Sequence, residues 1–378
     1  MFEFATAARI VFGRGAASGL VKIAREFGSR ALVVTGRDSS RAARAVAGLE
    51  CEWFAVPGEP TVGLVREGVD RARQARSEVV ISIGGGSAID AGKAIAILAA
   101  NSGEPLDYLE VVGRGQAFER PGLPYIAVPT TSGTGSEVTR NAVLGSPEHG
   151  VKASLRSPWM LAKAAVVDPE LTMGLPAAIT ASTGLDALTQ LIEPYVSIRA
   201  NAMVDLFCLE GIRRIAASLK RVLTDGSDRE ARESMSFASL LGGLSLANAG
   251  LGVVHGFAAP IGGMIDAPHG AVCAAILPHG MAANIRGLRE RDPAGPGLRR
   301  YTEVAKVLTG NPLASPEDGV AVVRELCGEA GVESLMKLGV SRQDLPVLVE
   351  KASRASSMKA NPIVLTPEEL SVVLDESL

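Results

Sequence analysis

The stretch GLDALTQLIE, residues 184–193, places a carboxylate and an amide where they could act together. Its composition and spacing predict a helix, and Asp186 and Gln190, four residues apart, would share one face of that helix. Two interpretations fit these residue types: a side-chain pair that supports the helix, or half of a metal site. The choice depends on which other metal-binding side chains the chain supplies.

Three of the four histidines fall in residues 234–285, a region with a single charged side chain. His255, in GVVHGFAAP, and His269, in APHG, are interpreted either as buried polar groups that hold helix ends or as metal ligands. The other two are interpreted as structural, with His279 in a predicted LPHG turn and His149 in a predicted exposed SPEHG loop.

A glycine-rich segment, SIGGGSAIDAGKAIA at residues 82–96, follows a predicted strand and opens a predicted helix. It places Gly84, Gly85, Gly86 and Ser87 at the carboxyl end of a sheet. Glycines let the backbone approach a pyrophosphate closely, and the N–H groups at the start of the helix stabilise its charge. A tight turn is the simpler alternative, but a turn needs only one glycine. The segment therefore predicts a nucleotide-phosphate site.

A second loop of small residues, PTTSGTGSEVT at 129–139, also follows a predicted strand. The hydroxyls of Thr130, Thr131, Thr134 and Thr139 could line the same cofactor. Loops of Ser, Thr and Gly are common in turns, so this signal is weak alone.

The elements that must position these residues change in type near residue 175. Five apolar runs predict strands and three amphipathic stretches predict helices, and their alternation indicates a parallel sheet covered on both faces. The strands are expected at 31–35, 52–56, 78–83, 125–129 and 164–168, and the helices at 40–48, 61–74 and 87–100. The sequence thus predicts an α/β nucleotide-binding domain at 1–175 and an all-helical domain at 176–378.

Composition supports a globular enzyme that acts on small molecules. The chain of 378 residues suits two domains, with 47% hydrophobic and 21% charged residues. A net charge of -3 without a long basic run argues against nucleic-acid binding. The scattered cysteines favour buried reduced thiols over a zinc knuckle or disulfides, and the N-terminus does not read as a secretory signal. These features predict a cytoplasmic protein; the cysteines are Cys51, Cys208, Cys273 and Cys327.

The uncharged run at 234–265 is long enough to span a bilayer. It contains Asn248, His255, Pro260 and several glycines, and it lacks flanking basic and aromatic anchors. A buried helical core around a site is therefore expected, without membrane insertion.

Neither glycine-rich loop matches GxGxxG. However, the order of GGGS, PTTSGTGSEVT, DPELT, GLDALTQLIE and PHG resembles the iron-containing alcohol dehydrogenase family, from GRGA at 13–16 to SSMKANP at 356–362. The resemblance implies a dehydroquinate-synthase-like fold, a nicotinamide-nucleotide domain followed by a helical domain, a metal in the cleft between them, and a homodimer.

The resemblance also implies which residues bind the cofactor. Three would hold the pyrophosphate and six would line the adenosine and nicotinamide sites, although Lys152 has the alternative of a solvated surface lysine. The first group is Gly85, Gly86 and Ser87, and the second is Thr130, Thr131, Thr134, Thr139, Asn141 and Lys152.

The residues after the first predicted strand bear on the choice between NAD and NADP. NAD-preferring members of the family tend to carry an acidic residue where this chain has Gly36, because a carboxylate binds both ribose hydroxyls and repels a 2′-phosphate. Arg37, Ser39 and Arg41 could bind that phosphate, although both arginines could also be ordinary surface charges. The sequence thus favours NADP over NAD.

By the same resemblance, Asp186, His255 and His269 match catalytic metal ligands and would hold Fe(II) or Zn(II) beside an alcohol oxygen. Two positions depart from the family. Gln190 stands where a third histidine is usual, and it would act as a weak fourth metal ligand or as a hydrogen-bond partner of the substrate. An amide oxygen is a weaker ligand than imidazole, so metal affinity should fall. Ala259 stands where a second histidine often relays the proton, so the proton would leave through water and the cofactor ribose hydroxyls.

The leading functional prediction is an NAD(P)-dependent alcohol dehydrogenase or aldehyde reductase acting on a small alcohol or carbonyl compound. One alternative is a metal-independent reductase similar to maleylacetate reductases. Another is a lyase similar to dehydroquinate synthases, whose phosphorylated substrate needs basic residues that 234–285 lacks. A binding module without catalysis is the weakest alternative, because it would not explain two cofactor loops.

Gln190→His is expected to tighten metal binding, because it adds an imidazole donor one helical turn after Asp186. Metal content after purification would be compared between the wild type and the variant. Unchanged occupancy would mean that residue 190 does not face the metal.

Overall fold

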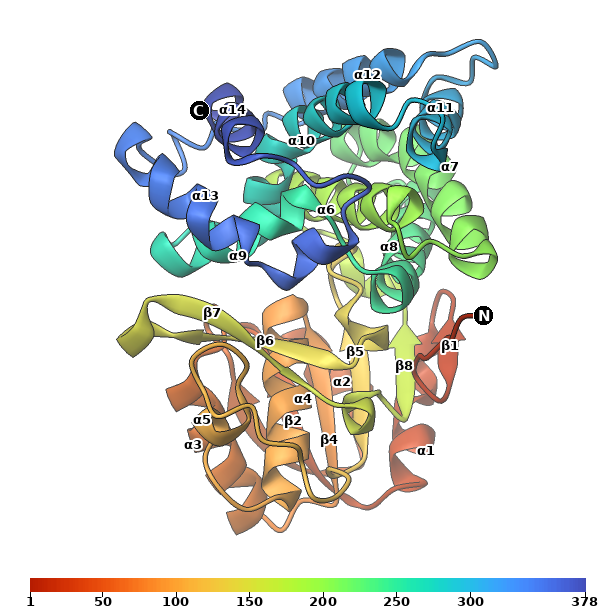
Figure 1. Ribbon diagram of the computed structural model, residues 1–378. Helices are drawn as coiled ribbons and strands as arrows, with labels where there is room; N and C mark the ends of the chain where they lie inside the picture. Colours follow the sequence, from red (N-terminus) through yellow and green to blue (C-terminus); the bar gives the residue numbers. More distant parts are fainter. The chain divides into compact units, whose positions relative to one another are not determined.

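Figure 1 shows the computed structural model, which describes the backbone of all 378 residues and every side chain except that of Arg41. The predicted phosphate contact of Arg41 therefore lies outside the described residues. The chain forms two compact units, and each is described by itself. The nucleotide unit, named for its predicted function, comprises Ala5–Thr131 and Gly135–Met173, and the helical unit comprises Met1–Phe4, Ser132–Thr134 and Gly174–Leu378.

The nucleotide unit is built on a parallel sheet of six strands, in the order β1-β8-β5-β4-β2-β3 (Figure 1). The five predicted strands are present, and the predicted parallel sheet is confirmed. The additional strand, β1, has three half-buried residues, too few to produce a pattern in the sequence. The strands are β1 (Ile10–Phe12), β2 (Arg30–Thr35), β3 (Glu50–Ala55), β4 (Val79–Gly84), β5 (Tyr125–Pro129) and β8 (Ala164–Val167).

Helices cover both faces of this sheet. Alternate side chains of each strand point to opposite sides, so each face makes its own contacts with helices. On one face, Ile81 and Ile83 of β4 belong to a core with residues of α1 and α2. On the other, Ser82 donates a hydrogen bond to the carbonyl of Ala88 in α4 at 2.9 Å. The helices of this unit are α1 (Leu20–Arg25), α2 (Ser40–Ala45), α3 (Val62–Gln74), α4 (Gly86–Ala100) and α5 (Pro105–Tyr108).

A separate antiparallel hairpin, β6 (Asn141–Ser146) and β7 (Val151–Arg156), was not expected from the sequence. Burial alternates along β6, as a strand with one covered face requires. His149 lies at the exposed tip of this hairpin, where its Nδ1 is 2.7 Å from the Ser146 hydroxyl. The expected exposed, structural role of His149 fits this position.

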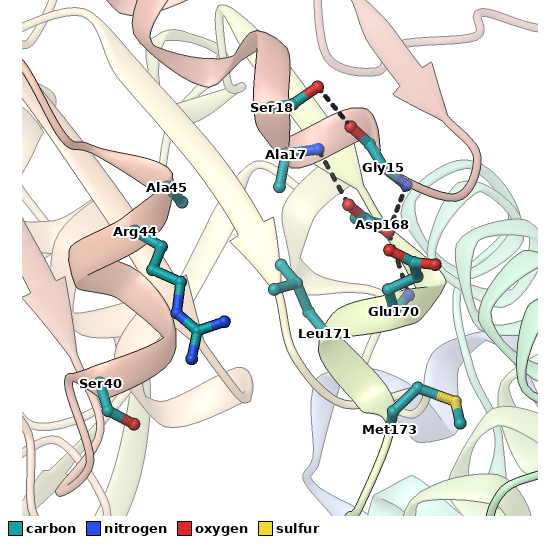
Figure 2. A pocket seen from close by; sticks show the side chains of 10 residues that line it. All are labelled: Gly15, Ala17, Ser18, Ser40, Arg44, Ala45, Asp168, Glu170, Leu171 and Met173. Carbon is teal, nitrogen blue, oxygen red and sulfur yellow. Dashed lines mark hydrogen bonds between the residues drawn. The ribbon is translucent and has the colours of Figure 1, made fainter.

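Asp168, in the DPELT motif, ties the end of β8 to the turn η1 (Ala16–Gly19), as Figure 2 shows. Its carboxylate accepts hydrogen bonds from the backbone N–H groups of Gly15, Ala17 and Glu170, each at 3.0 Å. A cavity of about 560 Å³ opens beside this junction. The motif therefore has a structural function in this unit.

The helical unit confirms the predicted all-helical architecture. Helix α10 packs against α6, α9, α12 and α14, while α6, α7 and α8 pack against one another. Its helices are α6 (Ala177–Val196), α7 (Ala202–Thr224), α8 (Arg229–Ala249), α9 (Val253–Met264), α10 (His269–Arg291), α11 (Pro296–Thr309), α12 (Pro316–Glu329), α13 (Leu345–Ser353) and α14 (Pro367–Ser377).

The predicted LPHG turn is wrong, because Pro278 and His279 lie inside α10. Proline leaves the carbonyl four residues earlier without its helical donor. Here that carbonyl belongs to Ala274, and the Cys327 thiol donates to it at 3.5 Å. His279 itself contacts Glu376 at 3.4 Å, which agrees with a structural role.

The charge-poor region 234–285 forms α8, α9 and much of α10, and most of its side chains are buried. The buried helical core predicted there is thus confirmed. Within the described chain no single helix is long and apolar enough to cross a membrane. The pair α8 and α9 meets that test together by length and composition, with a bend of 97° between them.

Asp168→Ala is expected to lower the free energy of unfolding by about 1–3 kcal/mol, because three backbone donors lose their acceptor. Urea unfolding followed by circular dichroism would measure the change. Glu26→Ala is the matched control, since Glu26 makes an exposed ion pair with Arg9 and exposed ion pairs contribute little to stability. Equal losses in the two variants would contradict the structural role of Asp168.

Candidate functional site

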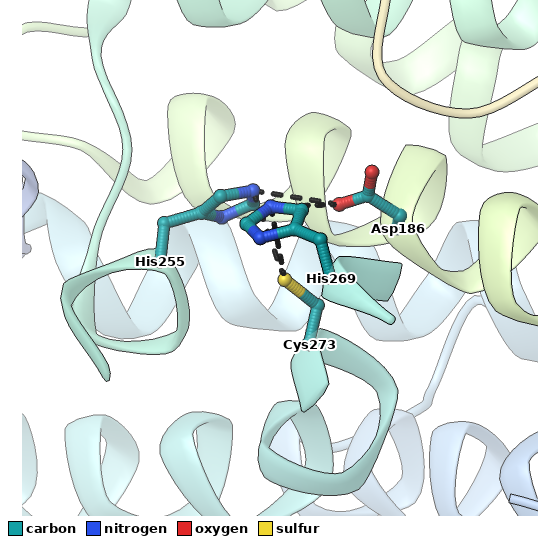
Figure 3. Close-up of side chains that lie close together, drawn as sticks. All are labelled: Asp186, His255, His269 and Cys273. Carbon is teal, nitrogen blue, oxygen red and sulfur yellow. Dashed lines mark hydrogen bonds and ion pairs between the residues drawn. The ribbon is translucent and has the colours of Figure 1, made fainter. Parts of the chain in front are cut away.

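Four potential metal ligands converge in the helical unit, as Figure 3 shows. Asp186 lies on α6, His255 on α9, and His269 and Cys273 on α10. Their donor atoms all lie within 4.8 Å of one another. The structure therefore brings the three sequence-predicted ligands together and adds a thiol that the sequence analysis interpreted as an ordinary buried cysteine.

The spacing of these atoms fits a divalent metal. Asp186 Oδ1 lies 3.5 Å from His255 Nε2 and 3.9 Å from His269 Nε2. Cys273 Sγ lies 3.9 Å from His255 Nε2 and 3.6 Å from His269 Nε2. Tetrahedral coordination with bonds of about 2.0–2.3 Å separates ligand atoms by roughly 3.3–3.6 Å. Small side-chain movements would thus bring all four atoms to bonding distance of one ion.

Helix geometry explains why α10 supplies two of these groups. His269 and Cys273 are four residues apart, so they share one face at the start of the helix. Gly270 allows that start to lie close to α6, since a Cβ atom there would come within 2.4 Å of the Ser182 carbonyl oxygen. The four-residue spacing of His269 and Cys273 can be read from the sequence HGAVC. It was the available signal that Cys273 lies beside a potential metal ligand.

Glu193 orients His255, and the sequence analysis did not identify it. One carboxylate oxygen accepts a hydrogen bond from His255 Nδ1 at 2.7 Å, and the other accepts from the Val254 backbone N–H at 2.7 Å. His255 therefore carries a proton on Nδ1 and turns Nε2 toward Asp186. A carboxylate behind a ligating imidazole is a common partner of metal sites. Its position seven residues after Asp186, on the same helix face, was the available signal.

The SSMKANP motif holds the start of α9 from the other side. Asn361 accepts hydrogen bonds through Oδ1 from the backbone N–H of Val253 at 3.0 Å and from Asn284 at 3.1 Å. Gly252 leaves room for this arrangement, because a Cβ atom there would lie 2.7 Å from Asn361 Oδ1. Asn361 thus positions the turn that precedes His255.

The site contains buried oxygens that lack a partner. Among the described side chains, none forms a hydrogen bond with Asp186 Oδ1 or Gln190 Oε1, and both atoms are buried. An unpaired buried oxygen is costly, so each requires an explanation. Gln190 lies one helical turn after Asp186, and its Oε1 lies beside Gly242 of α8. Ala259, at the expected proton-relay position, is exposed on α9.

The cluster is strongly coupled electrostatically. Burial raises the pKa of Asp186, but the nearby imidazoles and the Gln190 amide lower it to below its usual value. The charge of Cys273 raises the pKa of His269 to about 9. Burial lowers the pKa of His255, yet Cys273 and Asp186 raise it well above the usual value. In the absence of a metal, protons on the two imidazoles offset the negative charges of Asp186 and Cys273. A divalent metal ion would replace those protons and offset the same charges.

In the nucleotide unit, the predicted phosphate loop lies at the carboxyl edge of the sheet. Thr35 pairs with Ile83 and Gly84 with Pro129, so Gly36, the GGGS loop and Thr130 follow neighbouring strands. The Thr130 N–H donates to the Gly84 carbonyl at 2.9 Å.

The start of α4 is suited to an anion. Its N-cap residue, Gly85, has no side chain to occupy the first N–H groups, which belong to Gly86, Ser87 and Ala88. A Cβ atom on Gly85 would lie 3.4 Å from Thr131 Cγ2, which places the second loop beside the first. These positions fit the predicted cofactor contacts of this loop, which stay predictions.

A buried lysine fixes the second loop to the hairpin. Lys93, 1% exposed, donates to Thr139 Oγ1 at 2.9 Å and to the backbone carbonyls of Ser136 and Asn141 at 2.7 Å each. The Thr139 hydroxyl thus already has an internal partner. Burial lowers the pKa of Lys93 to about 8 and raises that of the neighbouring Glu137 to about 7.

The other predicted cofactor residues are placed in different surroundings. Lys152 is 13% exposed in its side chain and pairs with Glu59 at 3.4 Å, so it is not a solvated surface lysine. Thr134 belongs to the short segment that groups with the helical unit.

The coenzyme-selecting positions lie after β2. The position that a Cβ atom would take on Gly36 has no described heavy atom within 4 Å. Arg37 is exposed and donates to the Pro57 carbonyl at 2.6 Å, and Ser39 is exposed at the start of α2. Space for a larger coenzyme group therefore exists beside Gly36, and the preference for NADP stays a prediction.

Comparisons with known proteins agree with one another. Residues 7–169 match the family model described as iron-containing alcohol dehydrogenase, and residues 180–378 match that of the C-terminal region of the Fe-containing alcohol dehydrogenase family. The 1,3-propanediol dehydrogenase of Klebsiella pneumoniae is 34% identical over 338 residues, which cover 88% of this chain and 84% of that protein.

Two further proteins match over nearly full length. The NAD-dependent methanol dehydrogenase of Bacillus methanolicus is 32% identical over 385 residues, which cover 97% of each chain. The solved structure of an alcohol dehydrogenase from Oenococcus oeni matches with a TM-score of 0.92 and 28% identity, covering 100% of both chains.

Glu137→Gln is expected to remove a pH dependence of stability. Burial raises the pKa of folded Glu137 to about 7, whereas the carboxyl of an exposed glutamate in the unfolded chain has a pKa near 4.5. The folded state binds more protons within that window, so the free energy of unfolding of the wild type falls as pH rises through it. Because one pKa unit is worth about 1.4 kcal/mol, the fall attributable to Glu137 should be roughly 1–3 kcal/mol.

Urea unfolding of the wild type and of Glu137→Gln at pH values from 5 to 8 would measure this fall in the free energy of unfolding. The glutamine variant serves as the reference, because its side chain does not titrate. Stability curves that run parallel over the whole range would show that Glu137 does not titrate in this window.

Proposed function

Because the chain belongs to the iron-containing alcohol dehydrogenase family, we propose that it interconverts a small alcohol and its carbonyl product with NAD(H) or NADP(H), assisted by a metal held by Asp186, His255 and His269. The observation that carries the metal assignment is the convergence of these donors around the buried, unpartnered Oδ1 of Asp186. Fe(II) and Zn(II) both suit one carboxylate and two imidazoles.

When bound, the metal supplies a Lewis acid that polarises the substrate oxygen. The protein prepares that role with its own side chains. Glu193 holds the proton on His255 Nδ1 and so keeps Nε2 available as a donor, while Asp186 contributes a negative charge from within the core. Asn361 and Glu193 together hold the backbone N–H groups of Val253 and Val254, so the turn that leads to His255 is fixed without a bound metal.

The nucleotide unit would bind the coenzyme. The N–H groups at the start of α4 and the glycines that precede it would hold the pyrophosphate, with Thr130 and Thr131 beside them. A bound oxidised coenzyme would supply the acceptor for the hydride of the alcohol. Because Ala259 provides no base, the hydroxyl proton would leave through water and the ribose hydroxyls of the coenzyme. Gly36 and the exposed Arg37 favour acceptance of NADP, whereas the relative from Bacillus methanolicus is named as NAD-dependent.

The substrate is expected to be small and to lack strong negative charge. Residues 234–285 contain His255 and His269 but no Lys or Arg that would bind a phosphate or carboxylate. The relatives named for 1,3-propanediol and methanol agree with a small alcohol. The dimeric state and the cytoplasmic location stay predictions of the same proposal.

Removal of metal with a chelator is expected to lower the rate of NADPH- or NADH-linked aldehyde reduction by roughly 10²–10⁴-fold, because several kcal/mol of transition-state stabilisation are lost. Re-addition of Zn²⁺ or Fe²⁺ should restore it. Fluorescence titration of NADPH and NADH is the control, since the expected coenzyme contacts do not involve the metal ligands. Activity that persists in metal-free protein would favour a metal-independent reductase, and failure to bind either nucleotide would contradict the dehydrogenase assignment.

A further inference from the structure

We propose that Cys273 is the fourth protein ligand of this metal site and replaces the donor that is missing at Gln190. The site would then contain one carboxylate, two imidazoles and one thiolate, a set suited to zinc. The inference rests on the metal binding proposed above, but it does not depend on the reaction that the protein catalyses.

The position of the thiol supports this assignment. Cys273 is fully buried, and its Sγ lies between two imidazole nitrogens, 3.6 Å from His269 Nε2 and 3.9 Å from His255 Nε2 (Figure 3). Two other cysteines use their thiols differently: Cys51 and Cys327 each donate to a backbone carbonyl at 3.5 Å. A thiol directed at ring nitrogens that themselves face a carboxylate is arranged as a ligand.

Asp186 provides a second, independent observation. Its Oδ1 is buried, has no hydrogen-bond partner among the described side chains, and points at the same two imidazole nitrogens. Desolvating a carboxylate oxygen without a partner is unfavourable unless a cation takes that place. The unpartnered oxygen and the sulfur lie within 4.8 Å of each other in one cluster, so a single ion can contact both.

Gln190 is not placed to bind the ion. It shares a face of α6 with Asp186, one helical turn away. Its Oε1, the one atom of Gln190 able to ligate, lies beside Gly242 on α8. The fourth position is therefore assigned to Cys273.

The residues at positions 190 and 273 have opposite effects on the donor set. An amide at position 190 removes an imidazole donor, whereas a thiolate at 273 adds a softer, anionic donor. With Asp186 and Cys273 both ionised, the ligands neutralise the charge of a divalent ion. The weak metal affinity expected from Gln190 alone is therefore not expected for the whole site. Thiolate ligation also shifts the preference toward zinc.

Cobalt substitution tests the proposal directly, because a Co²⁺–thiolate bond produces a charge-transfer absorption band in the near ultraviolet. Metal-free wild type titrated with Co²⁺ should take up one equivalent and develop this band. Cys273→Ala should lose it, while Gln190→Ala and the matched buried-thiol control Cys327→Ala should keep it. Competition with a chromophoric chelator should show Zn²⁺ affinity falling roughly 100-fold or more in Cys273→Ala, beyond the 10–100-fold typical of losing an outer-shell partner.

The outcomes separate this inference from the proposed function. One equivalent of Co²⁺ bound by the wild type without the band would overturn the role of Cys273 and leave the dehydrogenase assignment intact. A band present in protein without activity toward alcohols or aldehydes would support the ligand and contradict the reaction. No metal uptake at all would overturn both metal roles. If Cys273→Ala fails to fold, as judged by circular dichroism, the wild-type spectrum and Cys273→Ser still decide the question.

Discussion

The double contact of Glu193 is the constraint on which the site depends. Its two carboxylate oxygens hold the His255 ring and the adjacent backbone of α9, and α6 carries Asp186 two turns earlier. One buried side chain thus fixes the distance between two helices and the tautomer of a histidine. The N–H groups at the start of a helix favour a negative charge, so the ionised carboxylate is stabilised where it is needed. Glu193 thus links α6, which carries Asp186, directly to the residue pair Val254 and His255 on α9.

In the nucleotide unit, a buried side chain of the opposite charge also holds separate backbone segments together. Lys93 lies in the core and joins α4 to the loop and hairpin that follow β5, through backbone carbonyls and the Thr139 hydroxyl. Such a buried ammonium is tolerated because Asp90 and four hydrogen-bond acceptors surround it. The backbone after β5 is thereby fixed, and that backbone carries the threonines expected to meet the coenzyme.

Periodicity and motif order were enough to predict the parallel sheet, the all-helical second half and three members of the cluster of potential metal ligands. They were not enough for Cys273, because a scattered cysteine resembles core residues until its neighbours in space are known. Glu193 was missed for the same reason: its partner, His255, is 62 residues away in the chain. The turn predicted at Pro278 was wrong because the carbonyl that proline leaves unpaired is satisfied by Cys327, from a helix far along the sequence.

Residues 190 and 273 lie on different helices, α6 and α10, yet each is a close neighbour of Asp186. More side-chain positions therefore lie next to Asp186 than a single four-coordinate metal ion requires for its ligands. A ligand lost on one helix can be recovered on another by a single substitution, while the backbone stays where it is. The preference of such a site for harder or softer metals therefore depends on single side chains, while the helices that carry them stay in place.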